Sequence, residues 1–318
     1  MSRRHSRRLV MGASAILLLS LTPAGVATAS SPSKLGGLPC PQRVAFHAGN
    51  FHHPTDIDNE YLPMVPGARH VYTGTTSGGS HQIVSTVTDL TKVVDGVTAR
   101  VIQEVDIQDG QVTESELTLF AQDDRGDVWN LAEYPETFNG NGKFTGAPDT
   151  WVAGLRNTLP GIHMLAFPEK QEVRNEPYLQ GSSPSIDFLD CARVHSVDGR
   201  MTGPLGTFHD VLTTYETSPL ESTTAIQTKE HAPHVGIVRV GAIHDPEGET
   251  LVLTRSVTLP RSERIAADRA ALREDAHGRT TNHLWAETPG ARLGCTPSVP
   301  ADHGVATTPT PGTVVPAP

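Results

Sequence analysis

The sequence has few aromatic residues, few cysteines and no long apolar run beyond its N-terminus. It contains 8 Phe, 5 Tyr and 3 Trp in 318 residues, so its core must consist mainly of Val, Leu, Ile and Ala. Basic residues are also scarce, because 25 Lys and Arg stand against 35 Asp and Glu, for a formal net charge of -10. Nucleic-acid binding needs clustered Lys and Arg, and this balance argues against it. We therefore expect an acidic, globular protein with a packed core.

The first 29 residues have the pattern of a signal peptide. Arginines at positions 3, 4, 7 and 8 precede an apolar run over residues 9–21, and small residues at 27 and 29 permit cleavage before Ser30. The run is shorter than the roughly 20 residues that a membrane span needs, so we expect no span in the mature chain. The pattern predicts a secreted, extracellular protein, and it leaves the general secretory and twin-arginine routes open. Residues 30–50 are expected to form an N-terminal linker.

Three cysteines in an oxidising compartment allow at most one disulfide within the chain. Cys40 and Cys295 each lie in loop-like sequence at one edge of the predicted folded region. We expect these two to pair. Cys191 is then predicted to be a small buried hydrophobic residue, with a catalytic thiol as the less favoured alternative because no basic neighbour is visible locally.

Alternating apolar and polar residues predict a mainly β protein. Between residues 97 and 107 the alternation is nearly clean, which indicates a strand with one apolar, buried face. Asp-Gly pairs at 95–96 and 109–110 are typical of tight hairpin turns. Similar runs follow to about residue 131 and resume between 187 and 259, which makes about nine or ten strands. We expect a curved antiparallel sheet or open half-barrel over residues 51–260.

The segment from 134 to 178 breaks this rhythm. Gly, Asn and Pro interrupt it repeatedly, so we expect a long loop, and long loops of this kind are often functional.

One helix is predicted after the strands, within a C-terminal extension over residues 261–297 that the expected disulfide would hold. Ser262 is expected to cap this helix. Its apolar stripe is expected to consist of Ile265, Ala266, Ala270, Leu272 and Ala276. Residues 298–318 are rich in Thr, Pro and Ala and predict a disordered tail.

Several short motifs resemble those of a group of uncharacterised secreted bacterial proteins of actinobacterial type. They include an Ile-Asp-Asn-x-Tyr-Leu-Pro-x-x-Pro-Gly motif, a Phe-Ala-Gln-Asp-x-x-Gly-Asp-Val-Trp motif and a Pro-Leu-Glu motif, and they lie at residues 57–67, 120–129, 151–154, 160–162, 206–208, 214–221 and 232–238. The resemblance covers roughly residues 51–258 and departs from the group's pattern at 173–178. It implies a curved antiparallel sheet like the half-barrels of envelope lipoprotein carriers, and it implies no activity.

Fifteen histidines suggest a metal enzyme, but their spacing gives this idea little support. The candidates are His52, His53, His231 and His234. A zinc site needs three or four converging ligands, usually with two on one stable element, and Pro233 prevents a helical pair of His231 and His234. We favour exposed loop histidines, predict no cofactor and leave a bound metal open.

The remaining reading is ligand binding. A curved sheet partly covered by a long loop and a helix can form an apolar cleft, and Trp129, Trp151, Met164 and Tyr178 are the predicted lining residues. Alternatively, these four belong to the ordinary core. The leading hypothesis is a noncatalytic protein that binds an apolar or cell-envelope ligand. The alternatives are a metal-dependent hydrolase that uses the loop histidines and a structural or interaction protein of the cell surface.

Overall fold

One antiparallel sheet of 15 strands dominates the computed structural model, which describes residues 40–170, 174–220 and 224–294. The predicted signal peptide, Cys295 and the predicted tail lie outside these ranges. None of the helices in the described ranges combines the length and the apolarity that a membrane crossing requires.

The first five strands form a meander of adjacent hairpins, as the sequence predicts. The strands are β1 (Ala68–Thr76), β2 (Gly79–Val94), β3 (Val97–Gln108), β4 (Gln111–Gln122), β5 (Val128–Phe138), β6 (Phe144–Gly146), β7 (Trp151–Val152), β8 (Leu159–Met164), β9 (Tyr178–Ser183), β10 (Phe188–Gly203), β11 (Gly206–Thr217), β12 (Ile226–Ala232), β13 (Gly236–Ile243), β14 (Thr250–Thr258) and β15 (Arg292–Leu293). Short 3-10 turns, η1 (Ala48–Asn50) and η3 (Pro184–Ile186), and two helices, α1 (Arg261–Thr281) and α2 (His283–Ala286), complete the fold.

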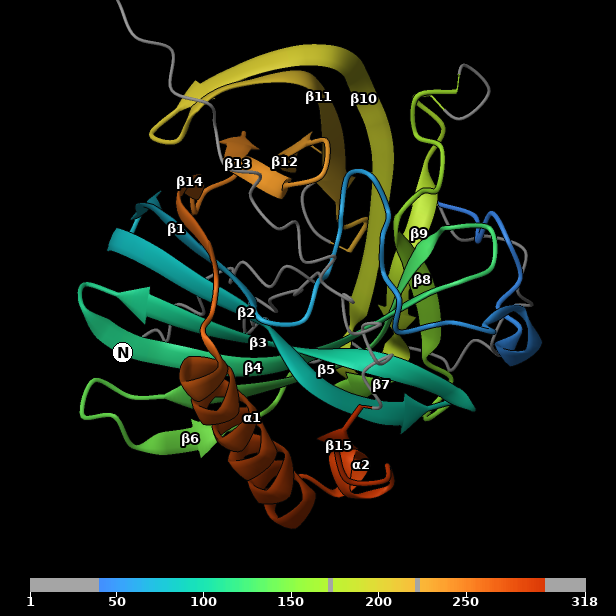
Figure 1. The fold of residues 1–318 in the computed structure, drawn as a ribbon, viewed down its shortest axis with the longest axis vertical. Helices are drawn as coiled ribbons and strands as arrows, with labels where there is room; N and C mark the ends of the chain where they lie inside the picture. Colours follow the sequence, from blue (N-terminus) through green and yellow to red (C-terminus); the bar gives the residue numbers. More distant parts are fainter. Residues whose placement is uncertain (1–39, 171–173, 221–223, 295–318) are drawn as a thin grey trace, which may run out of the picture.

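The sheet closes on itself, so the expected open half-barrel of nine or ten strands is wrong. β1 pairs with β14 along one edge and with β2 along the other, and this closes a barrel of 12 strands (Figure 1). Tyr72 of β1 stands opposite both Leu253 of β14 and Ile83 of β2. Closure leaves no free edge within the ring.

Three strands, β6, β7 and β8, lie in the segment of residues 134–178 that the sequence predicts to be a loop, and β9 begins at its last residue. β6, β7 and β8 pair with β5, and β9 joins β8 to β10. Pro160 is tolerated in β8 because the pairing is staggered. Leu159 and Pro160 pair only with β9, whereas Gly161 and the residues after it pair with β5. Proline therefore removes no hydrogen bond that the β5 ladder needs.

The two faces of the barrel wall follow from register. Ile102, Glu104 and Asp106 of β3 point into the barrel, whereas Val101 and Val105 point outward. Both sets are largely protected, since Val101 is 0% and Glu104 3% exposed. The alternation therefore predicts the strand correctly, but the polar face is enclosed because the barrel closes around it. Helix α1 packs on part of the outer face, where Glu274 contacts Gln103, and Val105 and Ile107 are half-buried.

The C-terminal helix is confirmed, although its start and its buried face differ from expectation. The residue that precedes its first turn is Pro260, and Ser262 makes no cap. Ile265 is 40% exposed. The helix instead buries two alanines, a glycine and three carboxylates: Ala267, Ala271, Gly278, Asp268, Glu274 and Asp275.

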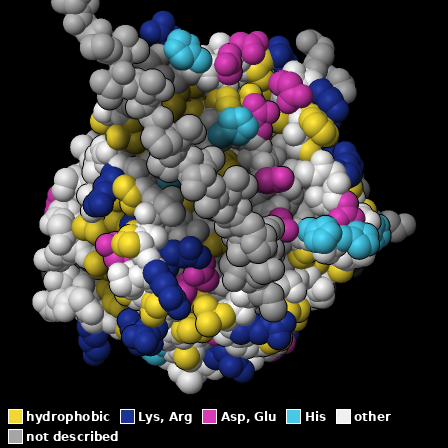
Figure 2. Space-filling view, viewed as in Figure 1, with side chains coloured by type: hydrophobic (Ala, Val, Ile, Leu, Met, Phe, Trp, Pro, Cys, Tyr) yellow, Lys and Arg dark blue, Asp and Glu magenta, His cyan; other side chains and the backbone are white. Residues whose placement is uncertain are grey.

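These carboxylates dock α1 on the outside of β2, β3 and β4. Asp268 accepts a hydrogen bond from the backbone N–H of Asp89, at 2.9 Å. Glu274 Oε2 accepts from Gln103 Nε2 and Ser115 Oγ, both at 2.7 Å. Arginines occupy much of the exposed side of the helix, and Lys and Arg side chains gather in Figure 2 where Figure 1 shows α1. Polar contacts therefore hold this helix to the barrel.

The disulfide joins Cys40 to Cys191, so the expected pairing of Cys40 with Cys295 is wrong. The two Cα atoms lie 5.8 Å apart. Cys191 belongs to β10 beside β9, and the chain after Cys40 reaches the same place because Leu179 N donates to the backbone oxygen of Pro41, at 3.1 Å. Both sulfur-bearing residues pack with Leu179 and Leu189. The error arose because sequence position does not show that the N-terminal segment runs alongside β9.

Candidate functional site

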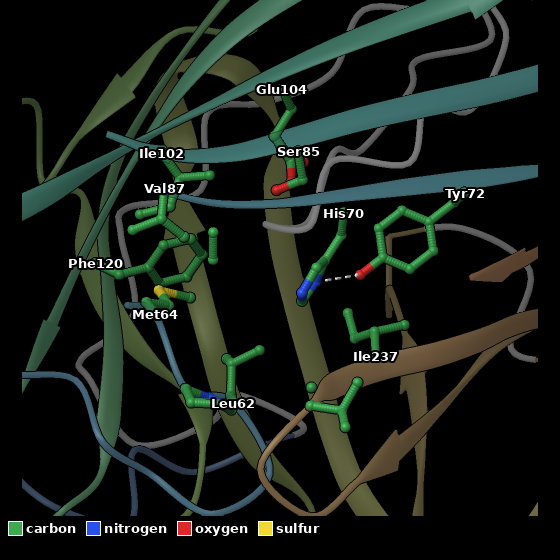
Figure 3. A pocket seen from close by; sticks show the side chains of 14 residues that line it. Leu62, Met64, His70, Tyr72, Ser85, Val87, Ile102, Glu104, Phe120 and Ile237 are labelled. Carbon is green, nitrogen blue, oxygen red and sulfur yellow. Dashed lines mark hydrogen bonds between the residues drawn. The ribbon is translucent and has the colours of Figure 1, made fainter. Parts of the chain in front are cut away.

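A small cavity of about 40 Å³ lies inside one part of the barrel wall. Strands β1 to β4 form one side, residues 62–64 of the segment 57–66 form the opposite side, and residues 235–237 at the start of β13 add a third (Figure 3). Most lining side chains are apolar: Leu62, Pro63, Met64, Ala68, Val87, Ile102, Phe120, Val235 and Ile237. The polar ones are His70, Tyr72, Ser85 and Glu104.

Asn59 holds the 57–66 segment in place. Its Oδ1 accepts from the backbone N–H groups of Tyr61 and Leu62, at 3.0 and 3.1 Å, as Asn side chains often do ahead of a turn. Its Nδ2 donates to the backbone oxygens of Gly126 and Leu165, both at 3.0 Å. Because Asn59 is 6% exposed, these four bonds position the segment firmly. Leu62 and Met64 consequently point into the cavity.

The polar side chains form a row across four neighbouring strands. His70 of β1 stands opposite Ser85 of β2, which stands opposite Glu104 of β3, which stands opposite Glu116 of β4. The first three line the cavity, and Glu116 continues the row into the barrel interior. The next row on the same face is apolar on β2 and β3, where Val87 stands opposite Ile102. The cavity therefore has an apolar wall and a polar wall.

The polar wall favours neutral histidine. Burial lowers the pKa of His70, and its Nδ1 lies 3.3 Å from the hydroxyl of Tyr72 (Figure 3). Burial raises the pKa of Tyr72, and the charge of Glu104 raises it further. At neutral pH the wall thus offers a neutral imidazole, a phenol, a hydroxyl and a carboxyl group.

The four predicted lining residues do not meet at this cavity. Trp129, Trp151, Met164 and Tyr178 are each at most 1% exposed. The Nε1 of Trp129 donates to Asp123 Oδ2 at 3.1 Å, and the rings of Phe46 and Phe51 pack against its indole.

Two of them point to other parts of the interior. Trp151 stacks on Phe188 at 5.3 Å between ring centroids, and its Nε1 donates to Glu133 Oε2 at 2.9 Å. Tyr178 stands opposite Ala192 of β10. That a ligand contacts these four residues stays a prediction.

The four candidate histidines are also dispersed. His52 Nδ1 lies 2.6 Å from Asp124 Oδ2 at the surface, and His53 is exposed nearby. Burial lowers the pKa of His231 to about 3, and its Nε2 lies 3.4 Å from Thr214 Oγ1. His234 occupies a turn with φ of 61°. Across the described ranges, no three His, Cys, Asp or Glu side chains are grouped so that they could hold a metal ion.

Sequence reasoning missed the charged groups of the barrel interior. His81 lies 2.8 Å from Asp106 and 2.9 Å from Glu249, and although burial opposes it, these two contacts raise its pKa to about 10. Lys229, 0% exposed, pairs with Glu216 at 2.7 Å. Each lies on a strand whose alternation is visible in the sequence. The sequence does show that each of these strands has a polar face. Once the barrel is known to be closed, that polar face lies inside it.

The sequence matches no known protein family and no curated protein. Among solved structures, it is similar to an exported protein of Bacteroides fragilis described as having a YmcC-like fold, with 15% identity and a TM-score of 0.37. It is also similar to a protein of Parabacteroides distasonis described as a lipoprotein, with 11% identity and a TM-score of 0.32. Each comparison covers 63% of this chain and 99% of the other. These scores are too low to assign a fold or function, and the family resemblance of the motifs stays a prediction.

Proposed function

We propose that the protein is secreted and binds an apolar ligand, or the apolar part of a cell-envelope ligand, without catalysing a reaction. The observation that carries this proposal is the cavity with one apolar and one polar wall inside a closed barrel. Ligand sites are typically apolar with a few placed polar groups, and larger barrels often enclose them. The Cys40–Cys191 disulfide and the signal-peptide pattern support secretion.

The order of the polar groups favours binding over catalysis. A catalytic Ser-His-acid arrangement places the histidine between the nucleophile and the carboxylate. Here Ser85 stands between His70 and Glu104, and His70 bonds to Tyr72. The carboxylate therefore does not orient the imidazole as a general base.

The size of the cavity limits what it can hold. An engineered cavity of about 150 Å³ accommodates benzene, whereas this one measures about 40 Å³. While Leu62 and Met64 are in place, only the end of an alkyl chain fits. A longer ligand must displace one of these two side chains. Substitution of Leu62 therefore tests the proposal.

The test is a series of n-alcohols from propanol to octanol, with binding measured by titration calorimetry and protein NMR. Each buried methylene should improve affinity about fourfold until the cavity is full. Leu62→Ala removes three carbons beside the cavity, so it should move this limit to a longer chain even though it lowers the stability of the fold by roughly 2–5 kcal/mol.

Val65→Ala is the matched control, because Val65 lies in the same segment and is 60% exposed. It should move neither the limit nor the stability. Absence of saturable binding for every alcohol, or an affinity that rises with chain length without a limit in all three proteins, would overturn the proposal.

A further inference from the structure

Beyond the cavity, polar side chains with unsatisfied atoms are concentrated on one arc of the barrel interior. They belong to β4, β5, β8 and β9, which are consecutive in the ring. Their unsatisfied atoms have no hydrogen-bond partner within the described residues, and each side chain is at most 3% exposed: Glu116 Oε1, Thr118 Oγ1, Asn130 Oδ1, His163 Nδ1, Tyr178 Oη and Gln180 Oε1. Most buried polar atoms in proteins are paired. Such a concentration indicates a surface that receives a polar group from a bound molecule.

Two carboxylates set the direction of the amides on this arc. Asn130 Nδ2 donates to Glu133 Oε1 at 2.6 Å, and Gln180 Nε2 donates to Glu216 Oε1 at 3.1 Å. Each amide thereby directs one N–H donor at a carboxylate, and its carbonyl oxygen is left without a partner among the described residues. The arc consequently offers amide and carboxyl oxygens as acceptors, beside hydroxyl and imidazole groups that can also donate.

The acceptors of β4 and β5 adjoin the cavity. Thr118 stands opposite Ile102, Glu116 stands opposite Glu104, and Phe120 stands opposite Asn130. Because Ile102, Glu104 and Phe120 line the cavity, Glu116, Thr118 and Asn130 occupy the positions of the barrel wall next to it.

We infer that the bound molecule is a primary amine, whose ammonium group is held by Glu116, Thr118 and Asn130 while its alkyl part occupies the cavity. This inference rests on the proposed function. An ammonium group carries three N–H donors and one positive charge, which match three acceptors of which one is a carboxylate.

The surrounding carboxylates favour a cationic head group over an anionic one. Glu104 and Glu116 are directly opposite one another, and like charges in that position are unfavourable. Burial raises the pKa of Glu116, and the charge of Glu133 raises it further, as expected where carboxylates are crowded. A bound ammonium offsets both effects. An anionic head group meets the same carboxylates, while Lys229 is already paired with Glu216.

The test compares butylamine, butanol and butyrate, which share one chain length and differ in charge, by titration calorimetry at pH 7. The amine should bind about tenfold more tightly than the alcohol, and butyrate should bind least. If none of the three binds, the proposed function fails together with this inference. If butyrate or butanol binds as tightly as butylamine, the binding function stands and the amine assignment is overturned.

Two variants assign the effect to named residues. Glu116→Gln keeps the shape of the side chain and removes its charge, so it should abolish the roughly tenfold preference for the amine and leave butanol affinity unchanged. Thr118→Val removes one acceptor and should weaken the amine severalfold, which also serves if Glu116→Gln does not fold. Glu263→Gln, on the exposed side of α1, is the control and should change neither affinity. Retention of the full amine preference in both interior variants would overturn the inference.

Discussion

The ammonium group of Lys92 on β2 lies 2.6 Å from Oδ1 of Asp275 on α1, and this ion pair is 0% exposed at the lysine and 5% exposed at the aspartate. Lys92 Nζ also donates to the backbone oxygen of Pro289 at 2.6 Å and lies 4.5 Å from the ring centroid of Trp285. Asp275 accepts in addition from Trp285 Nε1, at 3.0 Å, and from Ala291 N, at 2.9 Å. One buried network therefore joins α1, α2 and the following chain to the barrel.

Asp275→Asn should strongly destabilise the protein. The substitution leaves Lys92 buried without its countercharge, and removal of one partner of a buried pair typically costs about 3–5 kcal/mol. Urea unfolding followed by tryptophan fluorescence measures the loss. The matched control is Glu287→Gln in the exposed pair Arg156–Glu287, which should cost less than about 1 kcal/mol. Equal losses in the two variants would contradict the role given to the buried network.

Glu274→Gln should stabilise the protein at high pH. Burial raises the pKa of Glu274 to about 8, and hydrogen bonds from Gln103 and Ser115 offset only part of that rise. Because the pKa in the folded state exceeds the usual 4.5, the protonated form favours folding. Its contribution is fully present below about pH 4.5 and is lost as the pH rises through about 8.

Thermal unfolding between pH 5 and pH 9 checks this prediction. The variant has no proton to lose, so its melting temperature should exceed that of the wild type by an amount that grows with pH up to about 8. Glu263→Gln, at an exposed position of the same helix, should follow the wild type throughout. Parallel curves for the wild type and Glu274→Gln would show that this carboxyl ionises at its ordinary pKa.

Gly278→Ala should destabilise the protein although alanine is the better helix former. A Cβ at this position would lie 2.6 Å from Cζ of Tyr134 and 2.8 Å from Cδ1 of Trp285. At an exposed helical site the substitution would add about 1 kcal/mol of stability, whereas overpacking here should cost roughly 1–3 kcal/mol. Chemical unfolding decides the sign. A stabilised variant would mean that α1 does not press this closely on β5.

The regular strands were predictable because their alternation is a local property. Residues 97–107 alternate and form β3, and the turns at Asp95 and Asp109 adopt positive φ as their Asp-Gly sequences predict. Alternation alone does not show which face is inside. The closing contact between β1 and β14 joins residues such as Tyr72 and Leu253 that are far apart in the chain, and it reverses the expected exposure of the polar face.

The candidate site depends even more on distant residues. The bonds of Asn59 to the backbone of residues 61 and 62 are local. Its bonds to Gly126 and Leu165 depend on how β5 and β8 pair. The row from His70 to Glu116 is likewise a consequence of register across four strands, which no local pattern specifies.

The disulfide gives a prediction that separates the Cys40–Cys191 bond from any pairing that involves Cys295. Cys40 and Cys191 are 151 residues apart, and on the chain-entropy model closing such a loop restricts the unfolded state by about 5 kcal/mol. Cys191→Ser should therefore lower the free energy of unfolding by several kcal/mol, and Cys295→Ser should leave it unchanged. Thiol titration of the unfolded, unreduced wild-type protein should detect one thiol, and the same titration of Cys295→Ser should detect none. A stability loss in Cys295→Ser as large as that in Cys191→Ser would instead favour a bond that involves Cys295.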